Sequence, residues 1–393
     1  MVNKISKIFL VFFLFFSLAC SSNSSSPAVD DDAADTTPET QDTSDPVVDD
    51  GDPVENSDED AAPDISTEDD SDLIEDFDDV ADEDADFIED HDIFSDDDID
   101  EAETDDSDSG FDDFDGETLH LRIVAGNITS GNKQSYDPGE GIRIFQALKP
   151  DIALVQEMNY GNKKDADYKK FAQLIVGTNY YVVEDTSKYN IPNGIVSRYP
   201  IKETGSWDDP SLSDRELKWA VIDIPGEKDI FAVSVHLHTS PASDQTKAAL
   251  VIVDEIAKLK KADPDKYYYV VGGDFNGPTA VSSSGFGKNS TFYVSGPHPV
   301  DENGDEETNA NRNKQYDYVL ADYQLHEFQV PTVFYSSKDP TKTKIYENGL
   351  VFDTRLYSQS VLDEYFSPAK TSDSSASQMQ HMAVVKDFLI ELK

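Results

Sequence analysis

Two polar residues that follow an apolar segment have the types and spacing that phosphate chemistry requires. The stretch YYYVVGGDFNGPT, residues 267–279, begins like a buried strand and then presents Asp274 and Asn276. Residues two apart in extended geometry point to the same side, so the carboxylate and the amide face together. The carboxylate can hold or deprotonate a water, and the amide can donate a hydrogen bond to a phosphoryl oxygen. The glycines of this stretch permit close backbone approach and unusual dihedral angles.

Further polar residues lie at or just past the ends of other apolar segments. Asn127 follows LHLRIVAG, Glu157 follows DIALVQ, and His236 lies in DIFAVSVHLHTS. Ligand sites of layered α/β proteins gather at strand ends, so we expect these residues to join Asp274 and Asn276 in one site. A glutamate supplies the oxygen ligands that Mg²⁺ prefers, and a histidine is a candidate acid or base near neutral pH.

Strand-like and helix-like segments alternate from residue 119 to the C-terminus, which predicts an α/β domain over residues 119–393. The segment 243–263 has the spacing of a long amphipathic helix, with a Ser/Asp start signal and a lysine-rich end. The other expected helices are 141–150 and 168–177, and the expected strands are 119–128, 151–158, 193–201, 218–225, 229–240, 267–274, 316–322 and 382–392.

In order along the chain, these segments resemble the endonuclease/exonuclease/phosphatase superfamily, the DNase I-like proteins. The matching blocks are GNI at Asn127, LVQEM at Glu157, NGIVSRYPI, SVHLH at His236, GGDFN at Asp274 and Asn276, YDYVL at Asp317, and QHMAVVKDF at His381. GGDFN is the most specific of them, and together they cover nearly all of residues 119–393. The resemblance implies an α/β (α+β) fold, a four-layer α/β/β/α sandwich in which two mixed β-sheets pack face to face.

The resemblance also implies a divalent-metal phosphodiesterase or phosphatase with Mg²⁺ (or Mn²⁺) as its cofactor. Glu157 would be the principal metal ligand, with Asn127 close by. His381, oriented by Asp317, would be the acid/base and phosphate-binding histidine.

The remaining implied roles concern the water and the phosphate. Asp274 would align or deprotonate the attacking water, Asn276 would hold the phosphate, and His236 would stabilise the charge of the phosphorane. Arg215 and Arg312 are further candidates for phosphate binding, and simple solvation on loops is the alternative for both.

One position departs from the family pattern. The last histidine of the family usually follows an aspartate that adds a carboxylate to the metal site, whereas Gln380 precedes His381 here. Three alternatives follow. Glu157 holds the metal with help from the carbonyl oxygen of Gln380, or another carboxylate such as Asp373 substitutes, or the domain has lost catalysis and kept binding.

The charge of the chain is concentrated in one segment. Residues 21–117 hold 43 of the 81 Asp and Glu residues and no Lys or Arg, so the formal net charge of −50 mainly describes this segment. From residue 118 onward, 38 acidic residues face 29 basic ones, a net charge of −9. Strong duplex binding usually uses a basic face, which this domain could offer only as a local patch.

The substrate interpretations are therefore ordered but open. The leading one is a DNase-like nuclease with nucleic acid as substrate, because the blocks carry no inositol- or lipid-specific insertions. The alternative is a sphingomyelinase-like lipid phosphodiesterase or phosphatase. An enzyme of that kind acts on phospholipid and needs an exposed apolar loop, for which residues 330–337, VPTVFYSS, are a candidate. A third interpretation is an inactive surface binding module. We expect a monomer in each case.

The N-terminus has the pattern of an export signal. Lys4 and Lys7 precede an apolar run, residues 8–19, that is too short for a spanning helix and ends at Cys20. This resembles a bacterial lipoprotein signal peptide over residues 1–20, which implies lipidation of Cys20. An ordinary secretory signal with a chance cysteine is the alternative. Cys20 is the only cysteine in the chain, so no disulfide can form within it.

Residues 21–118 are rich in Asp, Glu, Ser and Thr with scattered Pro. Such a segment cannot bury enough apolar surface to offset its conformational entropy, and its charges repel each other. We expect an acidic disordered tether. The protein would then be lipid-anchored to a membrane of the bacterial cell envelope, at the outer membrane or cell surface, or secreted.

Overall fold

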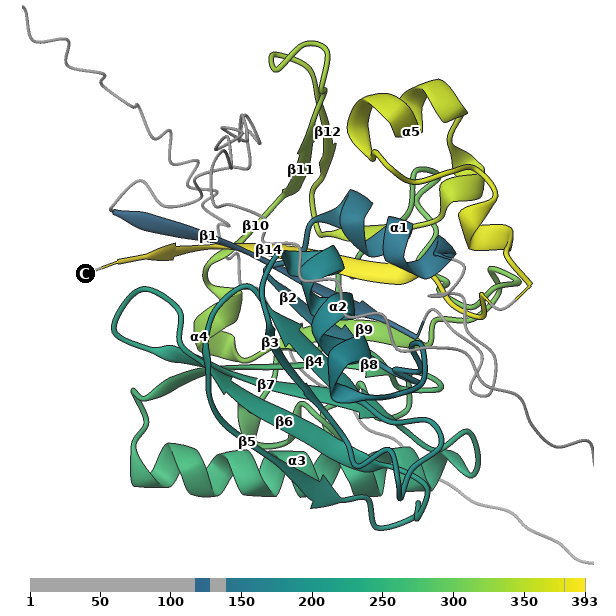
Figure 1. The fold of residues 1–393 in the computed structure, drawn as a ribbon. Coiled ribbons are helices and arrows are strands. Elements are labelled where there is room, and N and C mark those ends of the chain that lie inside the picture. The colour runs from purple at the N-terminus through teal and green to yellow at the C-terminus, as the bar shows by residue number, and fades with distance from the viewer. Residues whose placement is uncertain (1–116, 128–138, 378, 393) are drawn as a thin grey trace, which may run out of the picture. The chain divides into compact units, whose positions relative to one another are not determined.

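The computed structural model describes residues 117–127, 139–377 and 379–392, and these residues form two β-sheets with helices on the outside (Figure 1). The expected signal peptide with Cys20, and all of the acidic segment except its last two residues, lie outside the described residues. The first strand begins at Thr118, one residue before the expected domain start.

The first sheet has the strand order β10-β14-β1-β2-β4-β3, and β13 also pairs with β14. Its strands β1 and β2 run parallel, and its other neighbours run antiparallel, so the sheet is mixed. The strands are β1 (Thr118–Gly126), β2 (Ile152–Val155), β3 (Tyr180–Val183), β4 (Gly194–Ser197), β10 (Gln329–Val330), β13 (Leu350–Phe352) and β14 (Ala383–Glu391).

The second sheet has the order β5-β6-β7-β8-β9 and is also mixed, because β7 and β8 are parallel while the other neighbours are antiparallel. Its strands are β5 (Ile201–Asp208), β6 (Glu216–Ile222), β7 (Asp229–His236), β8 (Tyr267–Asp274) and β9 (Asp317–Ala321). A separate hairpin, β11 (Thr332–Tyr335) and β12 (Thr343–Tyr346), projects from the first sheet (Figure 1).

The two sheets pack against each other through small and branched side chains. Alternate residues of β1, among them Ile123 and Ala125, share one buried cluster with Ala232 and Val270 of the second sheet. The fit is close at Gly272, where an added Cβ would lie 2.8 Å from the Cδ1 atom of Leu154. The glycine therefore permits the close approach of the sheets that its sequence position suggested.

Helices cover the outer faces of both sheets. Helices α1 (Glu140–Leu148) and α2 (Asp165–Val176) bury their apolar sides in the cluster of the first sheet. Helix α3 (Ala242–Ala262) packs Ala248, Ile252 and Ile256 against the other face of the second sheet. The expected four-layer sandwich is thus confirmed. The expected Ser/Asp start signal of α3 is wrong, because the helix begins before Ser243 and has no side-chain cap.

Short elements complete the described part of the chain. They are α4 (Tyr323–His326), α5 (Gln359–Tyr365) and the 3₁₀ turns η1 (Lys288–Ser290), η2 (Thr354–Leu356) and η3 (Asp373–Ser375). Among the described residues, none of the helices has the length and apolar character needed to cross a membrane.

Candidate functional site

The polar strand ends meet in one cavity of about 420 Å³. The pairing of the second sheet explains part of this meeting, because His236 of β7 lies beside Asp274 of β8, and Asp274 lies beside Asp317 of β9. The lining residues are Asn127, Glu157, Ile191, Leu212, Asp214, Arg215, His236, His238, Thr239, Asp274, Asn276, Gln380 and His381.

Asp274 occupies the centre of this cavity. Its Oδ2 atom accepts a hydrogen bond from Asn127 Nδ2 at 2.9 Å and lies 3.4 Å from His236 Nε2 and 3.6 Å from His381 Nε2. Its Oδ1 atom accepts the backbone N–H of Asn276 at 2.8 Å. Burial opposes ionisation, but the positive charge of His381 and these hydrogen bonds outweigh it and lower the pKa of Asp274. Asp274 is therefore a carboxylate at neutral pH and can accept a proton.

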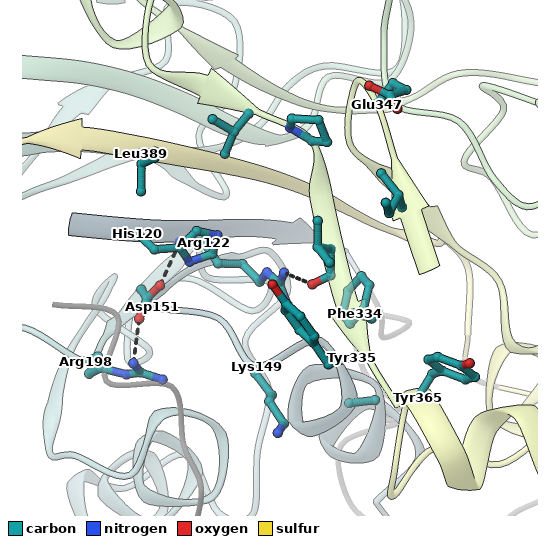
Figure 2. A pocket seen from close by; sticks show the side chains of 15 residues that line it. His120, Arg122, Lys149, Asp151, Arg198, Phe334, Tyr335, Glu347, Tyr365 and Leu389 are labelled. Atoms are coloured by element: carbon teal, nitrogen blue, oxygen red, sulfur yellow. Dashed lines mark hydrogen bonds and ion pairs between the residues drawn. The ribbon is translucent and has the colours of Figure 1, made fainter. Parts of the chain in front are cut away.

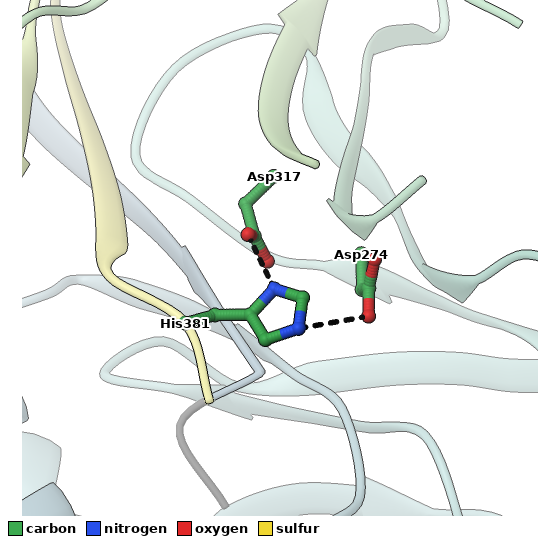
Figure 3. A group of neighbouring side chains, drawn as sticks. All are labelled: Asp274, Asp317 and His381. Atoms are coloured by element: carbon green, nitrogen blue, oxygen red, sulfur yellow. Dashed lines mark hydrogen bonds and ion pairs between the residues drawn. The ribbon is translucent and has the colours of Figure 1, made fainter. Parts of the chain in front are cut away.

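Asp317 and His381 form a buried dyad next to Asp274 (Figure 3). The Nδ1 atom of His381 lies 2.7 Å from Asp317 Oδ2, which also accepts a hydrogen bond from Thr308 Oγ1 at 2.7 Å. Burial disfavours the charged ring, but attraction to Asp317 and Asp274 is stronger and raises the pKa of His381 to about 10. Burial also raises the pKa of Asp317, to about 6. At neutral pH the dyad is an ion pair that directs an Nε2–H into the cavity.

Glu157 and Asn127 leave buried oxygens without partners. Asn127 Nδ2 lies 3.4 Å from Glu157 Oε1, whereas Glu157 Oε2 and Asn127 Oδ1 have no hydrogen-bond partner among the described residues. Burial raises the pKa of Glu157 to about 7, and the nearby charge of Asp274 adds to the rise. The backbone of Glu157 is left-handed, with φ 48°, a conformation that non-glycine residues adopt mainly at functional sites.

His236 is a neutral imidazole. It is fully enclosed, and this burial lowers its pKa to about 3 despite the attraction of Asp274. Its Nδ1 atom lies 3.9 Å from Glu157 Oε1 and accepts or donates no hydrogen bond within the described part of the chain. In the free protein, His236 can therefore act on a substrate through an N–H dipole and not through a full positive charge.

Asn276 stands at the mouth of the cavity in a left-handed conformation, with φ 53°. One of its amide hydrogens is donated to the carbonyl of Leu237 at 2.8 Å. The backbone carbonyl of Asn276 accepts a hydrogen bond from Gln245 Nε2 at 3.0 Å, which ties the turn to helix α3. An amide has two hydrogens, so one remains for a ligand.

The two candidate arginines are placed differently. Arg215 lines the cavity, but its Nε atom donates to the carbonyl of His236 at 2.7 Å, so it mainly braces the end of β7 and contributes a fixed charge. Arg312 does not line the cavity, because it pairs with Asp301 and lies 3.8 Å from Asp353.

The structure also distinguishes Gln380 from Asp373 as replacements for the missing carboxylate. Gln380 is exposed and lines the same cavity as Glu157. Asp373 lies outside the cavity lining, fully buried in an ion pair of 2.6 Å with Arg143. Asp373 therefore does not supply the missing carboxylate.

Sequence reasoning missed the residues that hold the site in place. Thr308 orients Asp317 and also accepts the backbone N–H groups of Tyr316 and Asp317, each at 2.9 Å. Gln245 ties α3 to the turn of Asn276. Both act across the fold from segments with no motif of their own, so no pattern in the sequence could have identified them.

A larger cavity of about 530 Å³ lies elsewhere and shares no lining residue with the first (Figure 2). Its walls are mostly apolar, with Phe334, Tyr335 and Leu389 among them. Its central arginine, Arg122, is held by Asp387 through two hydrogen bonds of 2.7 and 2.8 Å. Because its charged centre is neutralised in this way, the chemistry belongs to the smaller, polar cavity.

Two positions for a divalent ion compete within the polar cavity. Asp274, Asp317 and His381 place one potential ligand atom each within 4.8 Å of one another. However, the Oδ2 atom of Asp317 already receives hydrogen bonds from His381 and Thr308. The unpartnered oxygens of Asn127 and Glu157 are an all-oxygen donor pair of the kind that Mg²⁺ or Mn²⁺ takes, so these residues fit the ion better.

Comparison with solved structures gives many matches of low sequence identity. They include TDP2 from Caenorhabditis elegans, with 15% identity, coverage of 69% of this chain and 74% of that one, and a TM-score of 0.41. A mannosyl-6-phosphatase from Bacteroides thetaiotaomicron has 13% identity, coverage of 69% and 99%, and a TM-score of 0.41. A beta toxin from Staphylococcus aureus has 15% identity, coverage of 68% and 99%, and a TM-score of 0.41. No curated protein gives a significant match to the sequence.

The family assignment comes from a sequence profile. Residues 141–336 match the profile of the Endonuclease/Exonuclease/phosphatase family, a range that includes Glu157, Asp274 and Asp317. Together with the buried Asp–Asp–His group, this match supports a phosphoesterase activity and agrees with the resemblance of the sequence blocks. The chain belongs to the endonuclease/exonuclease/phosphatase family.

Proposed function

We propose that the protein is a divalent-metal-dependent phosphodiester hydrolase and that its substrate is nucleic acid. The observation that carries the proposal is the pair of buried, unpartnered oxygens of Asn127 and Glu157, which lie beside the ionised Asp274 and the protonated His381. An acceptor-rich pocket next to one carboxylate base and one imidazolium suits attack of water on a phosphate.

Asn127 and Glu157 would hold Mg²⁺ or Mn²⁺, with Gln380 as a further candidate ligand from the rim. When bound, the ion would supply Lewis-acid stabilisation of negative charge on the phosphate oxygens. It would also supply the partner that the buried oxygens of both residues lack.

The other residues of the cavity act on the water and the phosphate. Asp274 is ionised at neutral pH because its pKa is held low, so its carboxylate is available to accept the proton of the attacking water. His381 binds a phosphate oxygen through Nε2–H, and Asp317 fixes the ring orientation through Nδ1. Asn276 donates its free amide hydrogen to the phosphate, and His236 donates an N–H as charge builds up on the phosphorane.

A sphingomyelinase-like lipid phosphodiesterase is the second candidate, and one observation favours it. Ile345 is 55% exposed and Tyr335 is 45% exposed, both on the β11–β12 hairpin that begins within residues 330–337. Exposed apolar side chains on a projecting hairpin are what an enzyme acting at a lipid surface needs. A phosphatase of small phosphate esters uses the same chemistry, and an inactive binding module would share the cavity without turnover.

We further propose that the protein works as a monomer, tethered by a lipid on Cys20 to the bacterial cell envelope, or is secreted. The support is in the sequence: a short apolar run ends at the only cysteine, and an acidic segment separates it from the folded domain. Metabolic labelling with a fatty-acid analogue tests the anchor, because labelling should be lost in Cys20→Ser.

The test of activity uses the purified protein with four substrates: plasmid DNA, RNA, sphingomyelin and bis(4-nitrophenyl) phosphate. Each is assayed with Mg²⁺, with Mn²⁺ and with EDTA. We expect metal-dependent cleavage of the nucleic acids and a loss of roughly 10²–10⁴-fold in His381→Ala, since the protonated histidine contributes general acid–base and electrostatic catalysis. His326→Ala is the matched control, because His326 lies on α4 outside the cavity lining.

The outcomes separate the alternatives. Cleavage of sphingomyelin without cleavage of nucleic acid would replace the nuclease with the lipid phosphodiesterase. Turnover that persists in EDTA would refute the metal requirement. A folded protein that hydrolyses none of the four substrates would leave the binding module, and Gln380→Asp would then be the variant that tests whether the missing carboxylate explains the inactivity.

A further inference from the structure

A cavity of about 450 Å³, distinct from the larger apolar one around Arg122, adjoins the catalytic cavity and is named the second cavity. The two share Thr239 and Asn276 in their linings, so a ligand that crosses Asn276 enters both. The lining residues of the second cavity are Thr239, Ala242, Gln245, Asn276, Gly277, Pro278, Thr279, Lys314, Gln315 and Tyr316. A group bonded to a phosphate in the catalytic cavity would therefore lie in this second cavity.

The chemistry of the second cavity differs from that of the domain as a whole. Among the described residues that line it, there is one cation, Lys314, and no aspartate or glutamate, although the chain from residue 118 carries a net charge of −9. No described residue forms an ion pair with the exposed Lys314 ammonium, which lies 5.6 Å from the centroid of the Tyr316 ring. The cavity thus offers a ligand one aromatic ring and, over a face of that ring, one positive charge that pairs with no described carboxylate.

Tyr316 lines the second cavity and lies next to His381 of the catalytic cavity. Its ring centroid lies 5.8 Å from that of His381, at an interplanar angle of 37°, and the ring is partly exposed. Its backbone is fixed on both sides, because its N–H donates to Thr308 Oγ1 at 2.9 Å and its carbonyl accepts from Phe275 N at 2.8 Å. Thr308 also orients Asp317, so the backbone of Tyr316 is held by the same threonine that orients the catalytic dyad.

An aromatic ring beside a phosphate site, together with a single cation, matches a nucleotide chain. Bases stack on aromatic side chains when they are not paired in a duplex, and the phosphates alternate with them. The quaternary ammonium of a phosphocholine head would instead meet Lys314 without a carboxylate to offset the repulsion. The second cavity therefore favours nucleic acid over sphingomyelin.

We propose that the second cavity is a nucleotide subsite, in which Tyr316 stacks on the base next to the scissile phosphate and Lys314 binds the following phosphate, so that the substrate class is single-stranded nucleic acid. This inference rests on the proposed hydrolase function, because it takes the catalytic cavity as the place of the scissile phosphate. Tyr316 and Lys314 are then specificity-determining residues, since they bind the parts of the substrate that do not react.

The test begins with binding, measured by the fluorescence anisotropy of labelled hexathymidylate in EDTA. Tyr316→Leu should weaken binding about 10-fold or more, while Tyr316→Phe, which keeps the ring, should bind like the wild type. Lys314→Gln should weaken binding and reduce the slope of log K against log salt by about 0.7, the contribution of one phosphate of a single strand. Lys170→Gln is the matched control, because Lys170 is an exposed lysine of α2 that lines neither cavity.

Kinetics on two substrates then distinguish a subsite from an effect on catalysis. In Tyr316→Leu and Lys314→Gln, the KM for hexathymidylate should rise, whereas turnover of methyl 4-nitrophenyl phosphate, which has no neighbouring nucleotide, should stay as in the wild type. Equal losses on both substrates would mean that Tyr316 acts through His381, which would overturn the proposal. Unchanged binding in both variants, or tighter binding of a duplex than of the single strand, would overturn it too.

The same experiments separate this proposal from the proposed function. A protein that hydrolyses diesters but whose hexathymidylate binding ignores Tyr316 and Lys314 is a hydrolase without this subsite. A protein that binds hexathymidylate through both residues but hydrolyses no diester has the subsite and lacks the proposed activity.

Discussion

Replacing Glu157 with glutamine should stabilise the metal-free protein while removing its response to metal. Burial raises the pKa of Glu157 from 4.5 to about 7, so the folded protein binds more protons than the unfolded chain between these pH values. Stability therefore falls as the pH rises through this window and stays reduced above it. At about 1.4 kcal/mol for each tenfold change in proton affinity, the ionised carboxylate costs about 3 kcal/mol at pH 8.

Urea unfolding in EDTA at pH 4.5 and pH 8 measures this cost. Glu157→Gln should be more stable than the wild type by up to about 3 kcal/mol at pH 8, with little difference at pH 4.5. Added Mg²⁺ should stabilise the wild type, by about 2.7 kcal/mol at a hundredfold excess over its Kd, and should have little effect on the variant.

Glu184 provides a matched control. Burial also raises its pKa to about 7, but its oxygens accept the backbone N–H groups of Asn193 and Glu216, each at 2.9 Å. Glu184→Gln would turn an amide toward these donors and should lower stability by about 1–3 kcal/mol. The reasoning about Glu157 is refuted if Glu157→Gln is destabilised like this control, or if it keeps the pH dependence and the Mg²⁺ response of the wild type.

Three further predictions concern the strands around the site. The ammonium of Lys386 is buried near His298 and His326 with no hydrogen bond or ion pair to a described residue, and burial lowers its pKa from 10.5 to about 8. Lys386→Met should therefore gain about 3 kcal/mol of stability at pH 7, an advantage that disappears by pH 10.5, as measured by urea unfolding across this range. Gly273→Ala should lose about 3 kcal/mol or more in the same assay, because φ is +139° and the new Cβ would lie 2.1 Å from the carbonyl oxygen of Val235; a loss below 1 kcal/mol would contradict this. Asp317→Asn removes the main attraction that raises the pKa of His381, so the profile of kcat against pH should lose rate on its alkaline side, and an unchanged profile would show that the pair does not set the protonation of His381.

Several features of the fold follow directly from local sequence. The apolar run of residues 267–271 is a central strand because it is buried on both faces, by the other sheet and by α3. The glycines after it were expected to permit close approach, and the clash that a Cβ would cause at Gly273 confirms that expectation. The strands β3, β5, β10, β11 and β12 were not predicted, since partly exposed strands lack a strong apolar period, and the buried strand β13 was not predicted because it is only three residues long.

For the candidate site too, some features were predictable from sequence and others were not. The strand-end pattern predicted that Asn127, Glu157 and Asp274 would meet, and the family resemblance added His381, which precedes β14; all four line the same cavity. The sequence could not tell that Arg312 would pair with Asp301 outside the cavity, or that Asp373 would be neutralised by Arg143. The partner of a charged loop residue depends on segments far away in the chain.

Only the tertiary structure decided the protonation of the site and the existence of a second cavity. His236 and His381 are the same residue type, yet burial lowers the pKa of one to about 3 and two carboxylates raise that of the other to about 10. Tyr316 precedes Asp317 in sequence without any sign of a role, and only the fold places it in the lining of the second cavity, where Thr308 and Phe275 hold its backbone. The sequence determines which groups are present, whereas desolvation and long-range contacts, which exist only in the folded chain, determine their charge and their neighbours.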